Sequence, residues 1–189
     1  MENSESLIIT HEREKLINAI VYFAKNIQFL GKVKLFKLLY FLDFDHYKEV
    51  GRSVTGLDYF AWKMGPVPVS LYKEVDMPEQ DMAEKIEFIV KKVRNGDMLT
   101  VLPLCDFDQK HFTKRELRIM QSLVDQYANA RAEEMVEATH LENQPWHKVY
   151  IEEGNKQKII PYKLSVRKQE LNEINDLANE REEFIRHLS

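Results

Sequence analysis

The side chains in this sequence that could do chemistry include three that lie close together, Asp43, Asp45 and His46. A general acid and a general base must face the same reacting group, but residues two apart on a helix point to different sides. The sequence therefore predicts a poor acid–base pair. A hydrolase or transferase using these residues remains an alternative, because it requires a pocket of clustered titratable groups that only a structure can reveal.

The single thiol of the chain, Cys105, precedes a carboxylate, Asp106. A neighbouring negative charge raises the pKa of a thiol and disfavours the thiolate that acts as nucleophile. We therefore expect Cys105 to be a small packing residue.

The histidines and glycines offer no recognisable cofactor site. His46 and His140 could be paired as metal ligands, but six scattered histidines and one cysteine lack zinc-finger spacing. His140 is better explained as a hydrogen-bonding residue at a helix end. Gly65 and Pro66 lack the Gly-rich loop, lysine and hydroxyl of a phosphate cradle. The sequence predicts no enzyme, no metal and no cofactor.

Composition narrows the class of partner. The 189 residues carry 27 Lys and Arg against 31 Asp and Glu, a net charge of −4, which makes DNA an improbable main partner. One cysteine fits a reducing compartment, and we find neither a signal peptide nor a membrane span. We therefore expect a soluble, cytoplasmic protein with no membrane partner.

A central helix is predicted over residues 32–50. Its apolar stripe has the three-and-four spacing of a buried helical face, and aromatic residues widen it, so the helix must be packed on more than one side. Gly51 suits the left-handed residue that ends a helix. The stripe consists of Leu35, Leu38, Leu39 and Leu42, widened by Phe36, Tyr40, Phe44 and Tyr47.

Strands are predicted on the C-terminal side of this helix. Residues 59–63 form an aromatic strand, and Asn95-Gly96 is a typical two-residue turn between strands over 86–94 and 97–103. Together these strands could form one small sheet on the helices. Before the central helix, a helix capped by Thr10 is expected to end near Gly31 and to pack antiparallel to it.

The later part of the chain is predicted to be helical. Thr113 and Glu116 have capping-box spacing, Pro145 suits a first helical position, and Ser165 is expected to cap a tail helix. The predicted fold class is α+β and mainly α-helical: a helical bundle with a small antiparallel β-sheet or hairpin and a C-terminal helix. We divide the chain into a domain at 10–150 and an extension at 151–189 that docks on it.

The motifs of this chain resemble those of the Panacea domain, the SocA-like antitoxin family. The resemblance covers roughly residues 12–150. It rests on Lys34 to Phe41 (KLFKLLYF), on Phe60 to Val67 (FAWKMGPV) with Leu71-Tyr72, and on Thr139-His140 with Pro145-Trp146.

The resemblance implies an antitoxin that neutralises a cognate toxin by direct binding, and some members of the family deliver a toxin to a protease. Two alternatives stay open: a winged-helix-like DNA-binding regulator, and a phage or host adaptor. We expect the partner to bind around the Gly-Pro segment, with Phe60 and Trp62 packed inward and the alternate residues outward. The predicted partner-binding residues are Lys37, Tyr40, Tyr59, Trp62, Lys63, Met64, Gly65, Pro66 and Val67.

Three lysines, Lys32, Lys34 and Lys37, lie at the start of the central helix, where the helix dipole disfavours positive charge. One explanation is that solvent screens them or that nearby carboxylates offset them. The other is a basic spot kept for an acidic partner.

Overall fold

The computed structural model of the chain describes residues 11–93, 96–141, 144–166 and 170–188. The fold is α+β and mainly helical, which confirms the predicted class. In chain order its elements are α1 (Glu12–Asn26), α2 (Lys32–Val50), β1 (Tyr59–Trp62), β2 (Gly65–Pro68), α3 (Val69–Glu74), α4 (Gln80–Ala83), β3 (Ile86–Val93), β4 (Gly96–Pro103), α5 (Lys114–Tyr127), α6 (Ala132–His140), α7 (Pro145–His147), a π-helical turn (Lys148–Glu152), a 3₁₀ turn (Tyr162–Ser165) and α8 (Leu171–Leu188).

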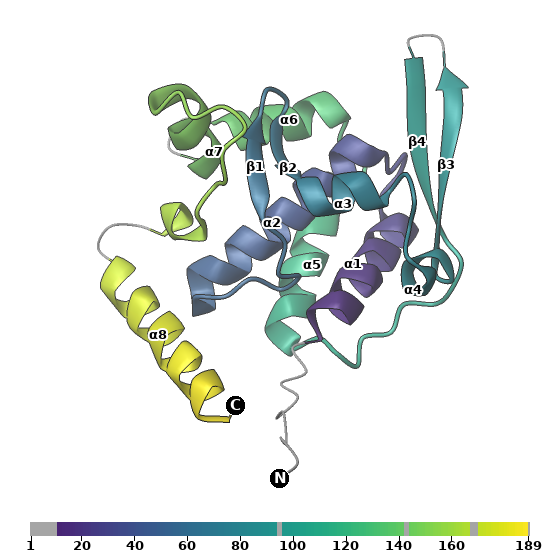
Figure 1. Cartoon of the computed structure of the whole chain (residues 1–189). Coiled ribbons are helices and arrows are strands. Elements are labelled where there is room, and N and C mark those ends of the chain that lie inside the picture. The colour runs from purple at the N-terminus through teal and green to yellow at the C-terminus, as the bar shows by residue number, and fades with distance from the viewer. Residues whose placement is uncertain (1–10, 94–95, 142–143, 167–169, 189) are drawn as a thin grey trace.

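Helix α2 is the centre of the fold (Figure 1), as its apolar stripe predicts. It contacts α1, α5, α6, α8, β2 and β4, and its four stripe leucines have no exposed surface. A helix that is buried on several sides needs apolar residues around most of its circumference. Gly51 ends α2 with a φ of 68°, as predicted, and its N–H donates to the Tyr47 carbonyl.

Helix α1 is shorter than expected. It ends at Asn26, because Ile27 is already extended, and residues 27–31 form a packed connection to α2. Ile27 and Leu30 are buried in this connection, whereas Phe29 points outward with 85% of its surface exposed. At the other end the cap position is His11, and the predicted cap Thr10 lies outside the described residues.

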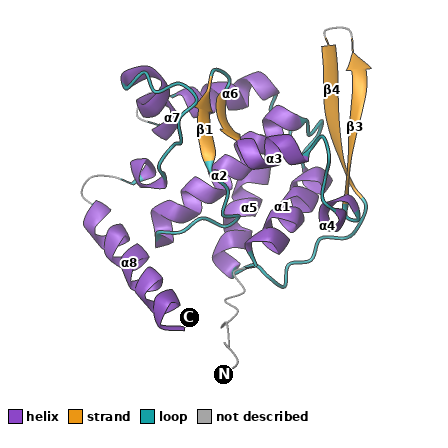
Figure 2. Cartoon of the chain, viewed as in Figure 1, coloured by secondary structure: helices purple, strands orange, loops and turns teal. Residues whose placement is uncertain are grey.

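The strands form two separate hairpins, drawn in orange in Figure 2, so the expectation of one sheet is wrong. Strand β1 pairs antiparallel with β2, with Phe60 opposite Val67, across a turn made by Lys63 and Met64. Strand β2 was not predicted, because Pro66 and Pro68 suggest a loop, although prolines are tolerated in edge strands. The hairpin predicted around Asn95-Gly96 is present as β3–β4, and residues 94–95 of its turn lie outside the described part of the chain.

The segment before the 3₁₀ turn packs along β1. The Ala61 N–H donates to the Lys158 carbonyl (2.8 Å), and the Ile160 N–H donates to the Tyr59 carbonyl (2.7 Å). Residues 157–160 therefore cover the free edge of β1, which would otherwise expose unpaired main-chain groups. Tyr162 follows and stacks on Tyr47, with ring centroids 5.3 Å apart.

The tail helix α8 begins at Leu171 and not at Ser165, which corrects the predicted start. Ser165 instead closes the 3₁₀ turn, where its hydroxyl donates to the Tyr162 carbonyl. The sequence also predicts a shared apolar face for this helix, formed by Leu171, Ile174, Ala178, Ile185 and Leu188. Ile174 is buried, and the other four side chains lie outside the described part of the structure.

The later helices follow their predicted signals. The Glu116 N–H donates to the Thr113 hydroxyl, and the Thr113 N–H donates to the Glu116 carboxylate, so the capping box is confirmed. Pro145 holds the first position of α7, as predicted, and Trp146 is buried in the core.

Candidate functional site

Lys37, on α2, reaches β2 through the interior of the protein. Its ammonium donates to the Pro66 carbonyl at 2.9 Å, and only 2% of the residue is exposed. Because burial disfavours the charged form, the pKa of Lys37 falls to about 7. A lysine with a lowered pKa can act as a nucleophile, but this one is closed off from any substrate. Its role here is to join α2 to β2.

Gly65 makes this close approach possible. Its φ of 100° favours glycine, and a Cβ at this position would lie 2.6 Å from Lys37 Nζ and 2.8 Å from Thr139 Oγ1. The turn after Trp62 therefore packs directly on α2 and α6. Thr139 is also fully buried, and its hydroxyl donates to the Val136 carbonyl.

Helices α6 and α7 close the other side of the hairpin. The His140 ring stacks on Trp146, with centroids 3.7 Å apart and planes 8° apart. His140 is the last residue of α6, as predicted, but its buried Nε2 has no hydrogen-bond partner among the described residues, so the predicted hydrogen-bonding role is wrong for this atom. The Trp146 indole N–H donates to the Trp62 carbonyl at 2.8 Å. Burial lowers the pKa of His140, and the Lys37 charge lowers it further.

These contacts bring together the three separated motifs that carry the family resemblance. We call the group formed by Lys37, Gly65, Pro66, Thr139 and Trp146 the motif cluster. It is buried throughout, so it holds the β1–β2 turn in place and offers no reacting group to solvent. Sequence reasoning named its members but placed several of them on the surface.

A second buried centre forms around Asp43. Its carboxylate has no exposed surface and accepts hydrogen bonds from the N–H groups of Val54 and Thr55, both at 2.8 Å. It also accepts from the hydroxyls of Thr55 (2.5 Å) and Tyr59 (2.7 Å). Burial raises the pKa of Asp43 to about 6, although these four donors favour the charged form and limit the rise. Asp43 thus ties the segment before β1 to α2.

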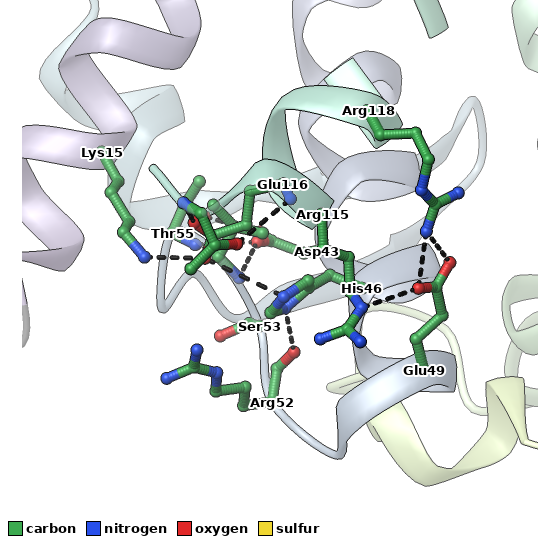
Figure 3. A network of polar contacts seen from close by, with 12 residues as sticks. Lys15, Asp43, His46, Glu49, Arg52, Ser53, Thr55, Arg115, Glu116 and Arg118 are labelled. Carbon is green, nitrogen blue, oxygen red and sulfur yellow. Dashed lines mark hydrogen bonds and ion pairs between the residues drawn. The ribbon is translucent and has the colours of Figure 1, made fainter. Parts of the chain in front are cut away.

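Lys15, Glu116 and His46 form a third centre, between α1, α5 and α2 (Figure 3). The Lys15 ammonium lies 2.7 Å from a carboxylate oxygen of Glu116, which itself is fully buried. Burial alone would raise the pKa of Glu116, but the Lys15 hydrogen bond and the capping box lower it overall. Burial lowers the pKa of His46, whose Nδ1 must carry the proton because it faces the Arg52 carbonyl at 2.9 Å.

The geometry separates the three residues that the hydrolase alternative requires. Asp43 is engaged by its four donors, His46 is 1% exposed, and Asp45 pairs with Lys48 at the surface. Substrate has no access to the first two in this structure. Glu49, drawn with His46 in Figure 3, forms surface ion pairs with two arginines of α5, Arg115 and Arg118.

One carboxylate trio among the described residues is close enough to hold a metal ion: Glu74, Glu79 and Asp81. The Arg13 guanidinium already occupies it, at 2.5 Å from Glu74 and 2.7 Å from Asp81. These carboxylates hold the Arg13 pKa above its usual range. Arg13 therefore already compensates the negative charge of this trio.

The predicted partner-binding residues divide sharply by exposure. Lys63 and Met64 are exposed at the turn, Met64 by 58%, and Trp62 is half-buried. The other six are buried: Lys37, Tyr40, Tyr59, Gly65, Pro66 and Val67.

The alternation along β1 is present, but the predicted sides are reversed. Tyr59 and Ala61 are buried, while Phe60 and Trp62 are half-buried. The reason is the Tyr59 hydroxyl, which donates to Asp43 inside the core. Asp43, an acidic residue within the apolar helix α2, is the sequence signal that could have indicated that Tyr59 points inward.

The solvent-screening explanation for the lysines of α2 is wrong for two of them. Lys34 and Lys37 are 4% and 2% exposed, and each ammonium donates to a main-chain carbonyl, that of Gln28 or Pro66.

Comparison with known protein families supports the family resemblance. The model of the family described as "Antitoxin SocA-like, Panacea domain" matches residues 35–147, which is more than half of the chain. The protein therefore belongs to this family of SocA-like antitoxin domains. Neither a curated protein nor a solved structure matches the chain. In the part of the chain that the structure describes, no helix is long and apolar enough to cross a bilayer.

Proposed function

We propose that this protein is an antitoxin that binds its cognate toxin directly and covers the toxin's working surface. The observation that carries the proposal is the motif cluster. Residues from three distant motifs of an antitoxin family meet beneath one exposed turn and fix its position. A rigid, pre-formed contact surface binds more tightly because less freedom is lost on association.

The proposed contact surface is the turn of the β1–β2 hairpin with its surroundings. Met64 and Lys63 are exposed there, and the Trp62 ring lies against the ring of Tyr72, 5.2 Å between centroids. Tyrosine and tryptophan are the side chains that most often dominate binding energy at interfaces. The buried members of the predicted site, such as Lys37 and Tyr59, would support this surface from below without touching the toxin.

Neutralisation of this kind needs neither catalysis nor a cofactor. Handover of the bound toxin to a protease, in the cytoplasm, is a further part of the proposal. The motif cluster would hold the contact surface in position, and binding of that surface to the toxin would by itself block the toxin. The buried lysine and carboxylates then serve folding and hold the surface in place.

The test is co-expression with the product of the adjacent gene, with both genes under unrelated promoters so that transcriptional control plays no part. We expect the neighbour to arrest growth when expressed alone, and this protein to restore growth and to copurify with it. The double variant Lys63→Glu/Met64→Asp should lose both effects. A toxic neighbour that is neither rescued nor bound would contradict the proposal.

The DNA-binding alternative makes a different prediction. A regulator should shift its own promoter DNA, and the shift should weaken steeply with salt because phosphate contacts release counterions. An adaptor would instead bind a partner that is not toxic. The same co-expression experiment, followed by a promoter shift assay, separates these two functions from the antitoxin.

A further inference from the structure

An apolar groove lies where the 27–31 connection, the start of α2, β4 and the start of α6 meet. Its volume is about 470 Å³. The apolar side chains that line it include Phe29, Val33 and Met98, which are 85%, 38% and 38% exposed. Exposed apolar residues that gather in one concave place mark binding sites more often than single exposed residues do.

The main chain holds Phe29 outward at the rim of this groove. The Gln28 N–H donates to the Ala128 carbonyl (3.0 Å), and the Leu30 carbonyl accepts from the Val101 N–H (3.3 Å). Between these anchors Phe29 has a φ of 51°, in the left-handed region that is costly for a bulky residue. Such strain persists where the surrounding structure imposes it, and it is common at binding sites.

The electrostatic character of the groove is positive. Its lining contains the cationic side chains of Lys32, Lys34 and Arg131 against one carboxylate, Glu133, and Lys32 also pairs with Asp76 at 3.8 Å. Two helices begin there, α2 at Lys32 and α6 at Ala132. Helix N-termini carry partial positive charge, which Glu133 and Glu134 offset in α6. The first turn of α2 contains no acidic residue, and its cap, Gly31, has no side chain to satisfy the free N–H groups. A carboxylate would find favourable potential here.

Lys34 is the most deeply buried of these three cations. Burial lowers its pKa, and the charge of Glu134 offsets only part of that lowering. It is 4% exposed, and its ammonium donates to the Gln28 carbonyl at 2.7 Å. In the parts of the chain that the structure describes, no carboxylate forms an ion pair with it. A partner carboxylate that reached the groove would therefore meet a pre-positioned and largely desolvated charge, where an ion pair is screened least.

The groove is continuous with the surface proposed around the β1–β2 turn. Trp62 contacts Tyr72, and the Lys32 ammonium lies 3.8 Å from the centre of the Tyr72 ring. Tyr72 belongs to α3, which lies between the two hairpins in the view of Figure 1. One partner could therefore cover the turn and fill the groove together.

From these observations we propose that the groove is the docking site for a segment of the toxin in which a bulky apolar side chain stands next to an Asp or Glu. The apolar side chain would lie against Phe29, Val33 and Met98, and the carboxylate would pair with Lys34. This inference rests on the proposed function, because the toxin supplies the segment.

The experiment uses the full chain and two groove variants in titrations with an inactive form of the adjacent gene's product. Phe29→Asn removes the apolar ring and suits the left-handed backbone, so the variant should fold at least as well as wild type. Lys34→Met removes the charge and keeps the length of the side chain. The matched control is Ile151→Asn, an apolar residue that is 55% exposed and lies outside the groove.

We expect Phe29→Asn and Lys34→Met each to weaken binding at least tenfold, and Ile151→Asn to change it less than twofold. If the toxin binds wild type and both groove variants equally, the groove inference is wrong and the proposed function stands. If wild type itself does not bind, the proposed function fails and the toxin is not the occupant.

A second measurement does not depend on the toxin. In an NMR titration, a blocked peptide with the sequence Glu-Phe-Leu-Glu should shift the signals of Val33 and Leu99, and a Lys-Phe-Leu-Lys peptide should not. Equal shifts with both peptides, or none with either, would contradict the acidic–apolar specificity.

Discussion

The ammonium of Lys37 lies 2.9 Å from the carbonyl oxygen of Pro66, and both groups are buried. This contact joins the N-terminal part of α2 to the strand that follows the proposed binding turn. The ammonium bonds to a main-chain carbonyl and not to a carboxylate. Burial therefore disfavours its charged form, and the pKa of Lys37 is lowered.

The pH dependence of stability tests this contact. The pKa of Lys37 is about 7 in the folded protein and 10.5 in an unfolded chain. Between these values the unfolded state binds the extra proton, so the free energy of unfolding should rise with pH. From pH 7 to pH 9.5 the rise should be about 3 kcal/mol. Urea denaturation of wild type and Lys37→Met should show this rise in wild type alone; parallel profiles would mean that Lys37 stays charged in the fold.

Gly65 should resist substitution more than a glycine of similar backbone elsewhere. Gly65→Ala should cost about 1–3 kcal/mol, because it combines left-handed strain with crowding against Lys37 and Thr139. The matched control is Gly154→Ala, where φ is also positive, +66°, but nothing lies within 4 Å of the new Cβ. Thermal unfolding should show a clearly larger loss at Gly65, and equal losses would exclude the crowding.

Asp43 should make the protein less stable, relative to Asp43→Asn, as the pH rises. Its folded pKa of about 6 exceeds the unfolded value of 3.8, so its stabilising contribution is complete below about pH 4 and declines as the pH rises through 6. The difference between the two proteins should change by about 2 kcal/mol between pH 4 and pH 7.5. An unchanged difference would show that the four donors hold the carboxylate in its charged form.

Lys15 and Glu116 should behave as a coupled buried pair. Lys15→Met leaves the Glu116 carboxylate buried without its cation and should cost about 3 kcal/mol in free energy of unfolding. Adding Glu116→Gln should recover most of that loss, since Gln keeps an acceptor for the capping box. Lys25→Met, which breaks an exposed pair with Asp106, should have no measurable effect. If the losses in free energy of unfolding from Lys15→Met and Glu116→Gln simply add in the double variant, the two side chains are not coupled.

Much of the fold could be predicted because it depends on local rules. The stripe of α2, the left-handed Gly51, the capping box at Thr113 and the 86–103 hairpin all follow from residue types at fixed spacing. The motif residues were also identified from the sequence. The burial of Lys37, Gly65 and Pro66 was not, because it depends on contacts across long separations, such as the Lys37 ammonium with the Pro66 carbonyl.

The errors have specific physical causes. Tyr59 points inward because its hydroxyl donates a hydrogen bond in the core to Asp43, sixteen residues earlier. The β2 strand was missed because prolines at 66 and 68 read as a loop. No sequence pattern predicted the groove, because Phe29, Met98 and Arg131 come together only when the 27–31 connection, β4 and the residues before α6 pack against one another.

Neutralisation of a toxin by direct binding requires a stable complex of the two proteins, which titration calorimetry with purified partners can measure. An inactive variant of the adjacent gene's product should bind the full chain saturably with a fixed stoichiometry, and Lys63→Glu/Met64→Asp should abolish the heat without lowering the thermal midpoint. Absence of binding by wild type, with a neighbour that is toxic and well folded, would contradict the account.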